Sequence, residues 1–182
     1  MDITVLFADI RGFTSYSEKL PPEKLVSILN RYLAAMAEAV LEHEGTIDKF
    51  MGDAIMAWFN APVPQPDHTL RAVKTALAIR SSVERLYQEL PADSQLAFGV
   101  GIHYGEAVLG LIGTEKRLEY TAISDSVNTA KRIQENSARN QILISQAVYE
   151  RIQKQVDAKP HAEIAMKGKT QPVGVYEVSG LK

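Results

Sequence analysis

Apolar residues follow two different spacings along this chain, and each spacing predicts one type of secondary structure. Residues 3–10 form a run rich in β-branched and aromatic side chains, which predicts a buried strand. Apolar residues then recur every three or four positions between Pro22 and Gly45, which predicts a long helix with one apolar face. The same spacing between Leu70 and Leu90 predicts a second amphipathic helix.

The remaining apolar stretches are shorter and are separated by turn residues such as Gly52 and Gly105. They predict strands at residues 46–50, 54–59, 96–104, 106–112, 141–145 and 173–178, and helices at residues 124–137 and 146–153. We expect the strands on either side of each glycine to pair. The order β-α-β-β-α-β is typical of the ferredoxin-like, or palm, arrangement, an antiparallel sheet with both helices on one face. We therefore predict an α+β fold in a single domain, residues 1–182.

The composition narrows the class of protein. The 182 residues carry 20 Lys and Arg against 22 Asp and Glu, and they include no cysteine. The lack of cysteine excludes disulfides, thiolate metal sites and a cysteine nucleophile. The net charge of −2 argues against a domain that binds a nucleic-acid polymer, because such domains carry a basic excess. We expect a cytoplasmic domain without membrane contact of its own, taken from a longer regulated protein because the chain starts close to a predicted strand.

Two aspartates stand at the ends of predicted strands. Asp9 closes the first strand, and Asp53 lies in the turn of the hairpin that should neighbour it in a palm sheet. Two carboxylates that converge at a sheet edge suit Mg²⁺, which proteins hold through one or two carboxylates plus substrate phosphates. Each aspartate taken alone is better explained as an ordinary turn or strand-end residue, and only the pair points to a metal.

Three separated segments carry further polar residues: FADIRGFT at 7–14, DKFMGDAIMA at 48–57 and YTAISDSVNTAKR at 120–132. Together and in this order they resemble the catalytic domain of the class III adenylate/guanylate cyclases, and the resemblance runs from Ile3 to about Val178. Ser124 replaces the glycine usual there and Lys131 a commoner small residue, but neither position has a catalytic role in the family. The resemblance implies conversion of a nucleoside triphosphate to a 3′,5′-cyclic nucleotide and pyrophosphate.

The resemblance assigns roles to individual residues. Asp9 and Asp53 match the two metal-binding aspartates, with the backbone carbonyl of Ile10 as a further ligand, for two Mg²⁺ or Mn²⁺ ions per active site. Asn128 matches the asparagine that orients the ribose, and Arg132 matches the arginine that stabilises the transition state. Because Asn128 and Arg132 are four residues apart on a predicted helix, they project from one face.

Three cations are candidates for phosphate contacts. The segment MKGKT at 166–170 resembles the loop that brings a lysine to the terminal phosphates. Lys167 is the better match and Lys169 the alternative. Arg117 stands where many family members carry a basic phosphate contact, and it fits an ordinary exposed arginine equally well. No Walker-type glycine-rich loop is present, so phosphate binding would depend on metals and these cations.

Base preference is predicted from two matched positions, Lys49 and Thr121. Lysine only donates hydrogen bonds, and adenine N1 accepts one, whereas guanine N1 carries a hydrogen. Lys49 therefore favours adenine, and the Thr121 hydroxyl can accept from the adenine amino group. Since this hydroxyl can also rotate and donate, it discriminates less strongly. The Lys/Thr pair resembles a subset of bacterial-type adenylate cyclases.

The resemblance also implies a homodimer with two active sites at its interface. In the family one protomer supplies the aspartates, and the other supplies the residues that match Lys49, Thr121, Asn128, Arg132 and Lys167. We therefore predict an adenylate cyclase that acts on ATP as a homodimer, with a regulatory domain upstream. The alternatives are a guanylate cyclase, a cyclase-like regulatory module without turnover, and a ferredoxin-like RNA-binding module. The charge and the lack of suitable aromatic residues oppose the RNA-binding module.

Overall fold

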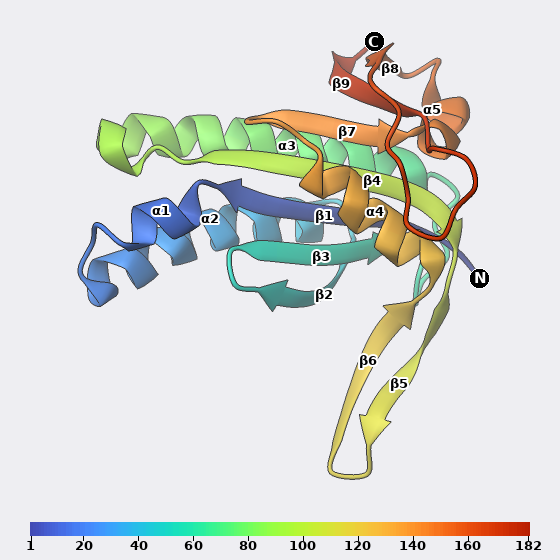
Figure 1. Cartoon of the computed structure of the whole chain (residues 1–182), viewed down its shortest axis with the longest axis horizontal. Coiled ribbons are helices and arrows are strands. Elements are labelled where there is room, and N and C mark those ends of the chain that lie inside the picture. Colours follow the sequence, from blue (N-terminus) through green and yellow to red (C-terminus); the bar gives the residue numbers. More distant parts are fainter.

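A seven-stranded sheet lies at the centre of the computed structural model, which describes residues 1–182 (Figure 1). Its strands are β1 (Asp2–Arg11), β2 (Thr46–Met51), β3 (Ala54–Phe59), β4 (Ala97–Glu106), β7 (Gln141–Ser145), β8 (Val156–Pro160) and β9 (Val175–Leu181). They follow the order β2-β3-β1-β4-β7-β9-β8. The predicted ferredoxin-like α+β fold is confirmed, and β1 lies beside the β2–β3 hairpin as expected. One pair, β4 with β7, is parallel rather than antiparallel.

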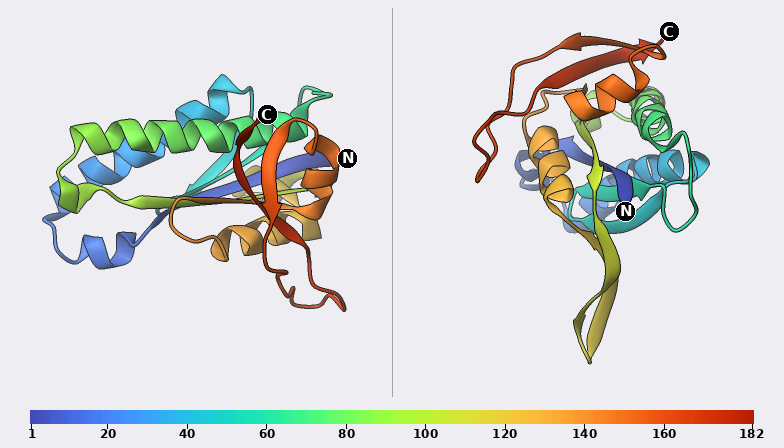
Figure 2. Two further views of the ribbon diagram at one scale, coloured as in Figure 1. Left: turned by 90° about the horizontal axis from the view of Figure 1, so that it is seen from above. Right: turned by 90° about the vertical axis from the view of Figure 1, so that its right-hand side faces the viewer.

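Helices cover both faces of this sheet (Figure 2). They are α1 (Phe13–Ser17), α2 (Pro22–Glu42), α3 (His68–Glu89), α4 (Asp125–Glu135) and α5 (Gln146–Ile152). The two long helices, α2 and α3, pack on one face, where they share one apolar core with Leu6 and Ala8 of β1. On the other face α4 packs over Val5 and Phe7 of the same strand. Because successive strand residues point to opposite faces, burial on both faces explains the unbroken apolar run of β1.

The position of α4 depends on Gly101 in β4. A Cβ atom at Gly101 would lie 2.2 Å from the backbone nitrogen of Gln134, so only glycine lets the helix backbone come this close to the strand. The helix starts directly after Ser124, whose hydroxyl accepts the N–H of Val127 at 3.2 Å and caps the first turn. Gly101 therefore sets how closely α4 approaches the sheet, and the Ser124 cap sets where the helix begins. Together they position the helix that carries Asn128.

A separate hairpin extends away from the body of the molecule (Figures 1 and 2). It consists of β5 (Val108–Thr114) and β6 (Arg117–Ile123). The expected pairing of residues 106–112 with residues 96–104 is wrong, because β4 continues to Glu106 and β5 pairs with β6, which we did not predict. Five of its apolar side chains are at least half exposed: Val108, Leu111, Leu118, Tyr120 and Ile123.

Two smaller elements were also not predicted, namely α1 and the edge strand β8. The last strand, β9, begins at Val175 and reaches Leu181, slightly later than expected. None of the helices combines the length with the apolar composition needed to cross a membrane.

Candidate active site

Asp9 and Asp53 lie together at one end of the β1–β3 pair. Asp9 is in register with Ala54, and the backbone N–H of Ile10 donates to the carbonyl oxygen of Asp53 at 3.1 Å. Burial raises the pKa of both carboxyl groups. The Arg11 guanidinium lowers the pKa of Asp9 in part, and the negative charge of Asp53 raises it further. The predicted convergence of the two carboxylates is therefore present in the fold.

Arg11 compensates the charge of this pair only partly. Its Nε lies 3.2 Å from Oδ1 of Asp9, but without hydrogen-bond geometry, so this buried oxygen has no hydrogen-bond donor. The guanidinium instead donates to the carbonyl of Gln134 and the hydroxyl of Ser137, at the C-terminal end of α4. A buried oxygen without a donor, next to a second carboxylate, fits a divalent cation.

The ligand set of such a cation would be small. No cluster of three or more His, Cys, Asp or Glu side chains occurs in the structure. Two carboxylates are nevertheless the number that Mg²⁺ commonly takes from a protein, with the remaining ligands supplied by water, backbone carbonyls and substrate phosphates. The residues present therefore fit a metal that is bound together with a phosphorylated substrate.

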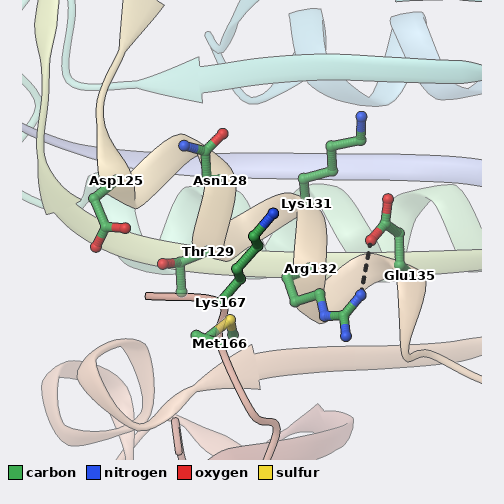
Figure 3. Close-up of a pocket in the computed structure, with 8 residues that line it drawn as sticks. All are labelled: Asp125, Asn128, Thr129, Lys131, Arg132, Glu135, Met166 and Lys167. Carbon is green, nitrogen blue, oxygen red and sulfur yellow. Dashed lines mark ion pairs between the residues drawn. The ribbon is translucent and has the colours of Figure 1, made fainter. Parts of the chain in front are cut away.

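Three of the other candidate residues gather along the outer face of α4. There, an open cleft of about 490 Å³ is lined by Asp125, Asn128, Thr129, Lys131, Arg132, Glu135, Met166 and Lys167 (Figure 3). It brings together Asn128, Arg132 and Lys167, three residues with predicted roles. Neither Asp9 nor Asp53 lines it.

Arg132 is free to meet a ligand in this cleft. Its side chain is 55% exposed, and its one ion pair, to Glu135, spans 3.8 Å. A pair of this length on an exposed helix face is weak, so an anion in the cleft would compete for the guanidinium at little cost. Asn128 is exposed one helical turn earlier, on the same face.

The loop between β8 and β9 brings Lys167 to this face. Met166 is buried against Ile133 of α4, and this contact holds the loop on the helix. The structure also separates the two alternative lysines. Lys169 binds Asp125 with an Nζ–Oδ2 distance of 2.8 Å, whereas Lys167 makes no ion pair and reaches over α4 (Figure 3). Of the two, Lys167 is the one available to a phosphate.

A second cavity of about 470 Å³ lies where β2 faces β6. Its lining residues are Asp48, Lys49, Phe50, Arg117, Glu119 and Tyr120. Lys49 Nζ lies 3.3 Å from Glu119 Oε2, and Arg117 lies 2.9 Å from Glu119 Oε1. Hydrogen bonds from these two cations lower the pKa of Glu119. The structure groups Arg117 with Lys49 rather than with Arg132, so a phosphate contact from Arg117 remains a prediction.

Asp48 joins the two predicted base-selecting residues, and the sequence did not single it out. The Thr121 hydroxyl donates to Asp48 Oδ2 at 3.0 Å, and Lys49 Nζ lies 3.7 Å from the same oxygen. The side chain of Asp48 is only 1% exposed. The one available signal was its place directly before Lys49, in a segment already marked by its resemblance.

The fold is a palm-type sheet with an aspartate pair where the end of β1 meets the β2–β3 turn, and a separate cleft holds Asn128, Arg132 and Lys167. This combination defines a nucleotide-converting catalytic domain. The chain belongs to the family described as the adenylate and guanylate cyclase catalytic domain, whose model matches residues 1–180.

Named relatives and solved structures agree with this membership. The chain is 35% identical to adenylate cyclase 1 of Rhizobium meliloti over 99% of its own length, which is 28% of that protein. It is 38% identical to the terminal-differentiation specific adenylate cyclase of Dictyostelium discoideum over 97% of its length, or 8% of that protein. The chain thus spans well under a third of either relative.

Two solved structures are similar over almost the whole fold. The adenylyl cyclase CyaB from P. aeruginosa has a TM-score of 0.92 and 36% identity, covering 98% of this chain and 93% of that one. The guanylyl cyclase Cya2 has a TM-score of 0.93 and 38% identity, covering 100% of this chain and 93% of that one. Because both nucleotide preferences occur at equal similarity, overall likeness does not select the base. That choice depends on individual side chains.

Proposed function

We propose that this chain is the catalytic domain of an adenylate cyclase, which converts ATP to 3′,5′-cyclic AMP and pyrophosphate. The observation that carries the proposal is the division of the predicted residues between two places. The aspartate pair lies where the end of β1 meets the turn between β2 and β3. The cleft on α4 holds Asn128, Arg132 and Lys167 without either aspartate. Each set is half of a site for a metal-bound nucleoside triphosphate.

In the reaction the ribose 3′ oxygen attacks the α-phosphorus, and the bond to the pyrophosphate leaving group breaks. Arg132 meets the negative charge that develops on the α-phosphoryl group. Asn128, one turn away on α4, holds the ribose so that its 3′ oxygen faces the phosphorus. Lys167 binds the terminal phosphates and so stabilises the departing pyrophosphate. We assign no side chain as general base.

Asp9, Asp53 and the carbonyl of Ile10 would hold two Mg²⁺ or Mn²⁺ ions. When bound, such ions lower the pKa of the attacking hydroxyl and offset the charge of the phosphates. The partly compensated carboxylate pair supports this assignment, because one buried oxygen of Asp9 has no hydrogen-bond donor and a cation would satisfy it. The number of ions belongs to the proposal.

A homodimer completes each site in this proposal. The β5–β6 hairpin supports it, because this arm gathers several large apolar residues that are at least half exposed, among them Val108 (71% exposed) and Leu111 (66% exposed). A two-fold contact between copies would bring the aspartates of one protomer to the α4 cleft of the other, twice. Further regulatory domains and a cytoplasmic location of the whole protein are part of the same proposal.

The test is incubation with Mn²⁺ or Mg²⁺ and either ATP or GTP at high protein concentration, with the products identified by mass. We expect cyclic AMP from ATP and much less cyclic GMP from GTP. Preferential formation of cyclic GMP would make the chain a guanylate cyclase, the function named for the similar structure Cya2. No cyclic nucleotide from either substrate would favour a regulatory module without turnover.

A further inference from the structure

Asp48 occupies an irregular position in β2. Ile47 is in register with Ala57 of β3, and Lys49 is in register with Met56, so Asp48 is an extra residue without a partner in the ladder. Such a β-bulge interrupts the alternation of a strand and re-aims side chains. Here it lets the side chains of Asp48 and Lys49 meet, although neighbours on a regular strand point to opposite faces.

The buried carboxylate of Asp48 makes one hydrogen bond to a side chain, and Thr121 is the donor. Its Oδ2 accepts the Thr121 hydroxyl at 3.0 Å, while its Oδ1 is buried without a partner. A carboxylate oxygen accepts hydrogen bonds and has no proton to give. The single proton of the Thr121 hydroxyl is therefore committed to Asp48, and only lone pairs of Thr121 remain for a ligand.

This bond decides which hydrogen-bonding groups Lys49 and Thr121 together offer to a purine. Lys49 offers donors only, and Thr121 held in this way offers an acceptor only. Adenine carries the complementary pair, an acceptor at N1 and a donor at the 6-amino group. Guanine carries the reverse pair, a donor at N1 and an acceptor at O6, so it would meet like groups at both positions.

We infer that Asp48 is a positioning residue that fixes Thr121 as a hydrogen-bond acceptor and thereby makes the site selective for adenine over guanine. The inference rests on the proposed function, since it concerns the base of the nucleotide in that same site. It removes the ambiguity of a freely rotating hydroxyl, because a threonine without Asp48 would accept from adenine or donate to guanine equally well.

The decisive variant is Asp48→Asn, whose amide has nearly the same shape. Its NH₂ group can donate to the Thr121 oxygen, which frees the hydroxyl proton to turn toward guanine O6. We expect the ratio of kcat/KM for ATP to that for GTP to fall at least about 10-fold, the effect of one mispaired buried hydrogen bond. Inosine triphosphate, which shares the N1–H and O6 of guanine, should gain in the same way.

Thr121→Val supplies an independent test, because it removes the acceptor and keeps the side-chain shape. It should lower the same ratio on its own. In the Thr121→Val background, Asp48→Asn should have no further effect on the ratio, since the cycle then isolates the coupling between these two residues. A merely structural Asp48 would lower activity with both nucleotides and leave the ratio unchanged.

Asp157→Asn is the matched control. The register of β8 also shifts at Asp157, between this residue and Ala158, but β8 is the far edge strand and Asp157 is exposed. It should change neither the ratio nor the activity. The inference would be overturned if Asp48→Asn left the ratio within about twofold of the unmodified chain, or if its effect were the same size with Val at position 121.

Binding measurements separate this inference from the proposed function. Fluorescent ATP and GTP analogues that cannot be cyclised would report base preference without turnover. A chain that forms no cyclic nucleotide, but whose preference for the ATP analogue falls at least about 10-fold in Asp48→Asn, refutes the proposed activity and supports the role of Asp48. If the chain makes cyclic AMP but Asp48→Asn leaves the base preference unchanged, the proposed activity is supported and the role of Asp48 is refuted.

Discussion

Ile10 and Asp53 are joined by a backbone hydrogen bond of 3.1 Å that ties the end of β1 to the turn between β2 and β3. This bond places Asp53 beside Asp9. Lys49 lies only four residues before Asp53 on the same hairpin, yet it contacts Glu119 in the cavity facing β6. One short hairpin therefore contributes to both halves of the proposed site, and in the proposed dimer those halves come from different protomers.

Mixing two inactive variants tests this division. Asp53→Ala removes a metal ligand and Arg132→Ala removes the transition-state cation, so each homodimer should lose at least about 100-fold in kcat. In the mixed dimer one site collects both defects and the other has none. With free subunit exchange we expect the mixture to recover about a quarter of the original activity, measured as cyclic AMP formed.

The matched control for this mixture is Asp53→Ala combined with Asp9→Ala. Both changes lie in the same half of the site, so every site of the mixed dimer keeps one defect and no activity should return. Recovery in this control, or none in the first mixture despite proven exchange, would contradict a site shared between protomers.

The two lysines of the loop before β9 should respond differently to substitution. Lys167 makes no ion pair, whereas Lys169 is bound to Asp125 at 2.8 Å. Lys167→Ala should lower kcat/KM for ATP about 10-fold or more and leave the unfolding temperature unchanged. Lys169→Ala should instead lower the free energy of unfolding by about 1 kcal/mol or less, because both partners are partly exposed. Steady-state kinetics measure the first effect and thermal unfolding the second. If Lys169→Ala lowered kcat/KM and Lys167→Ala did not, Lys169 would be the phosphate contact.

The main sheet and the two long helices were predictable because their apolar patterns are regular and their cores are large. The β5–β6 hairpin was not, since it has no core of its own. Five of its apolar residues are exposed, and residues 115–119 carry four charges, a pattern that predicts a loop. Strands whose side chains are mostly exposed carry little of the alternation on which sequence prediction depends.

The candidate site shows a similar limit. Asp9, Asp53, Asn128 and Arg132 lie in segments that resemble a family, and the fold places them as the order of elements implies. The role of Asp48 was not visible, because regular alternation would point it away from Lys49. A one-residue bulge reverses that geometry, and nothing in the letters of β2 marks a bulge.

Leu111 tests the hairpin as a dimer arm. Its side chain is 66% exposed on β5, so a charge there costs the isolated chain little. Leu111→Glu should shift the chain from dimer to monomer in analytical ultracentrifugation and abolish activity, with an unchanged unfolding temperature at low concentration, where the unmodified chain is also monomeric. Val63→Glu is the control, because Val63 is equally exposed (68%) but lies outside the hairpin. A Leu111→Glu variant that stayed dimeric and active would remove the hairpin from the interface.

His103 makes the stability of the fold depend on pH. It lies on β4 with Nδ1 2.9 Å from the Ser145 hydroxyl, and burial, aided by the charge of Lys169, lowers its pKa from 6.5 to about 4. The folded state therefore keeps His103 neutral. Between pH 6.5 and pH 4 the unfolded chain takes up a proton that the folded chain does not, so stability falls as the pH falls through this range.

Urea unfolding at pH 7 and pH 5 measures this contribution. One pKa unit corresponds to about 1.4 kcal/mol, so the unmodified chain should lose about 2 kcal/mol more than a His103→Gln variant over this change in pH. Other acid-sensitive groups are common to both proteins and cancel in the comparison. Glutamine keeps a partner for the Ser145 hydroxyl, so the variant should fold, with a lower stability at pH 7 and a flatter pH dependence. Parallel losses in the two proteins would mean that His103 becomes protonated in the folded state at its ordinary pKa.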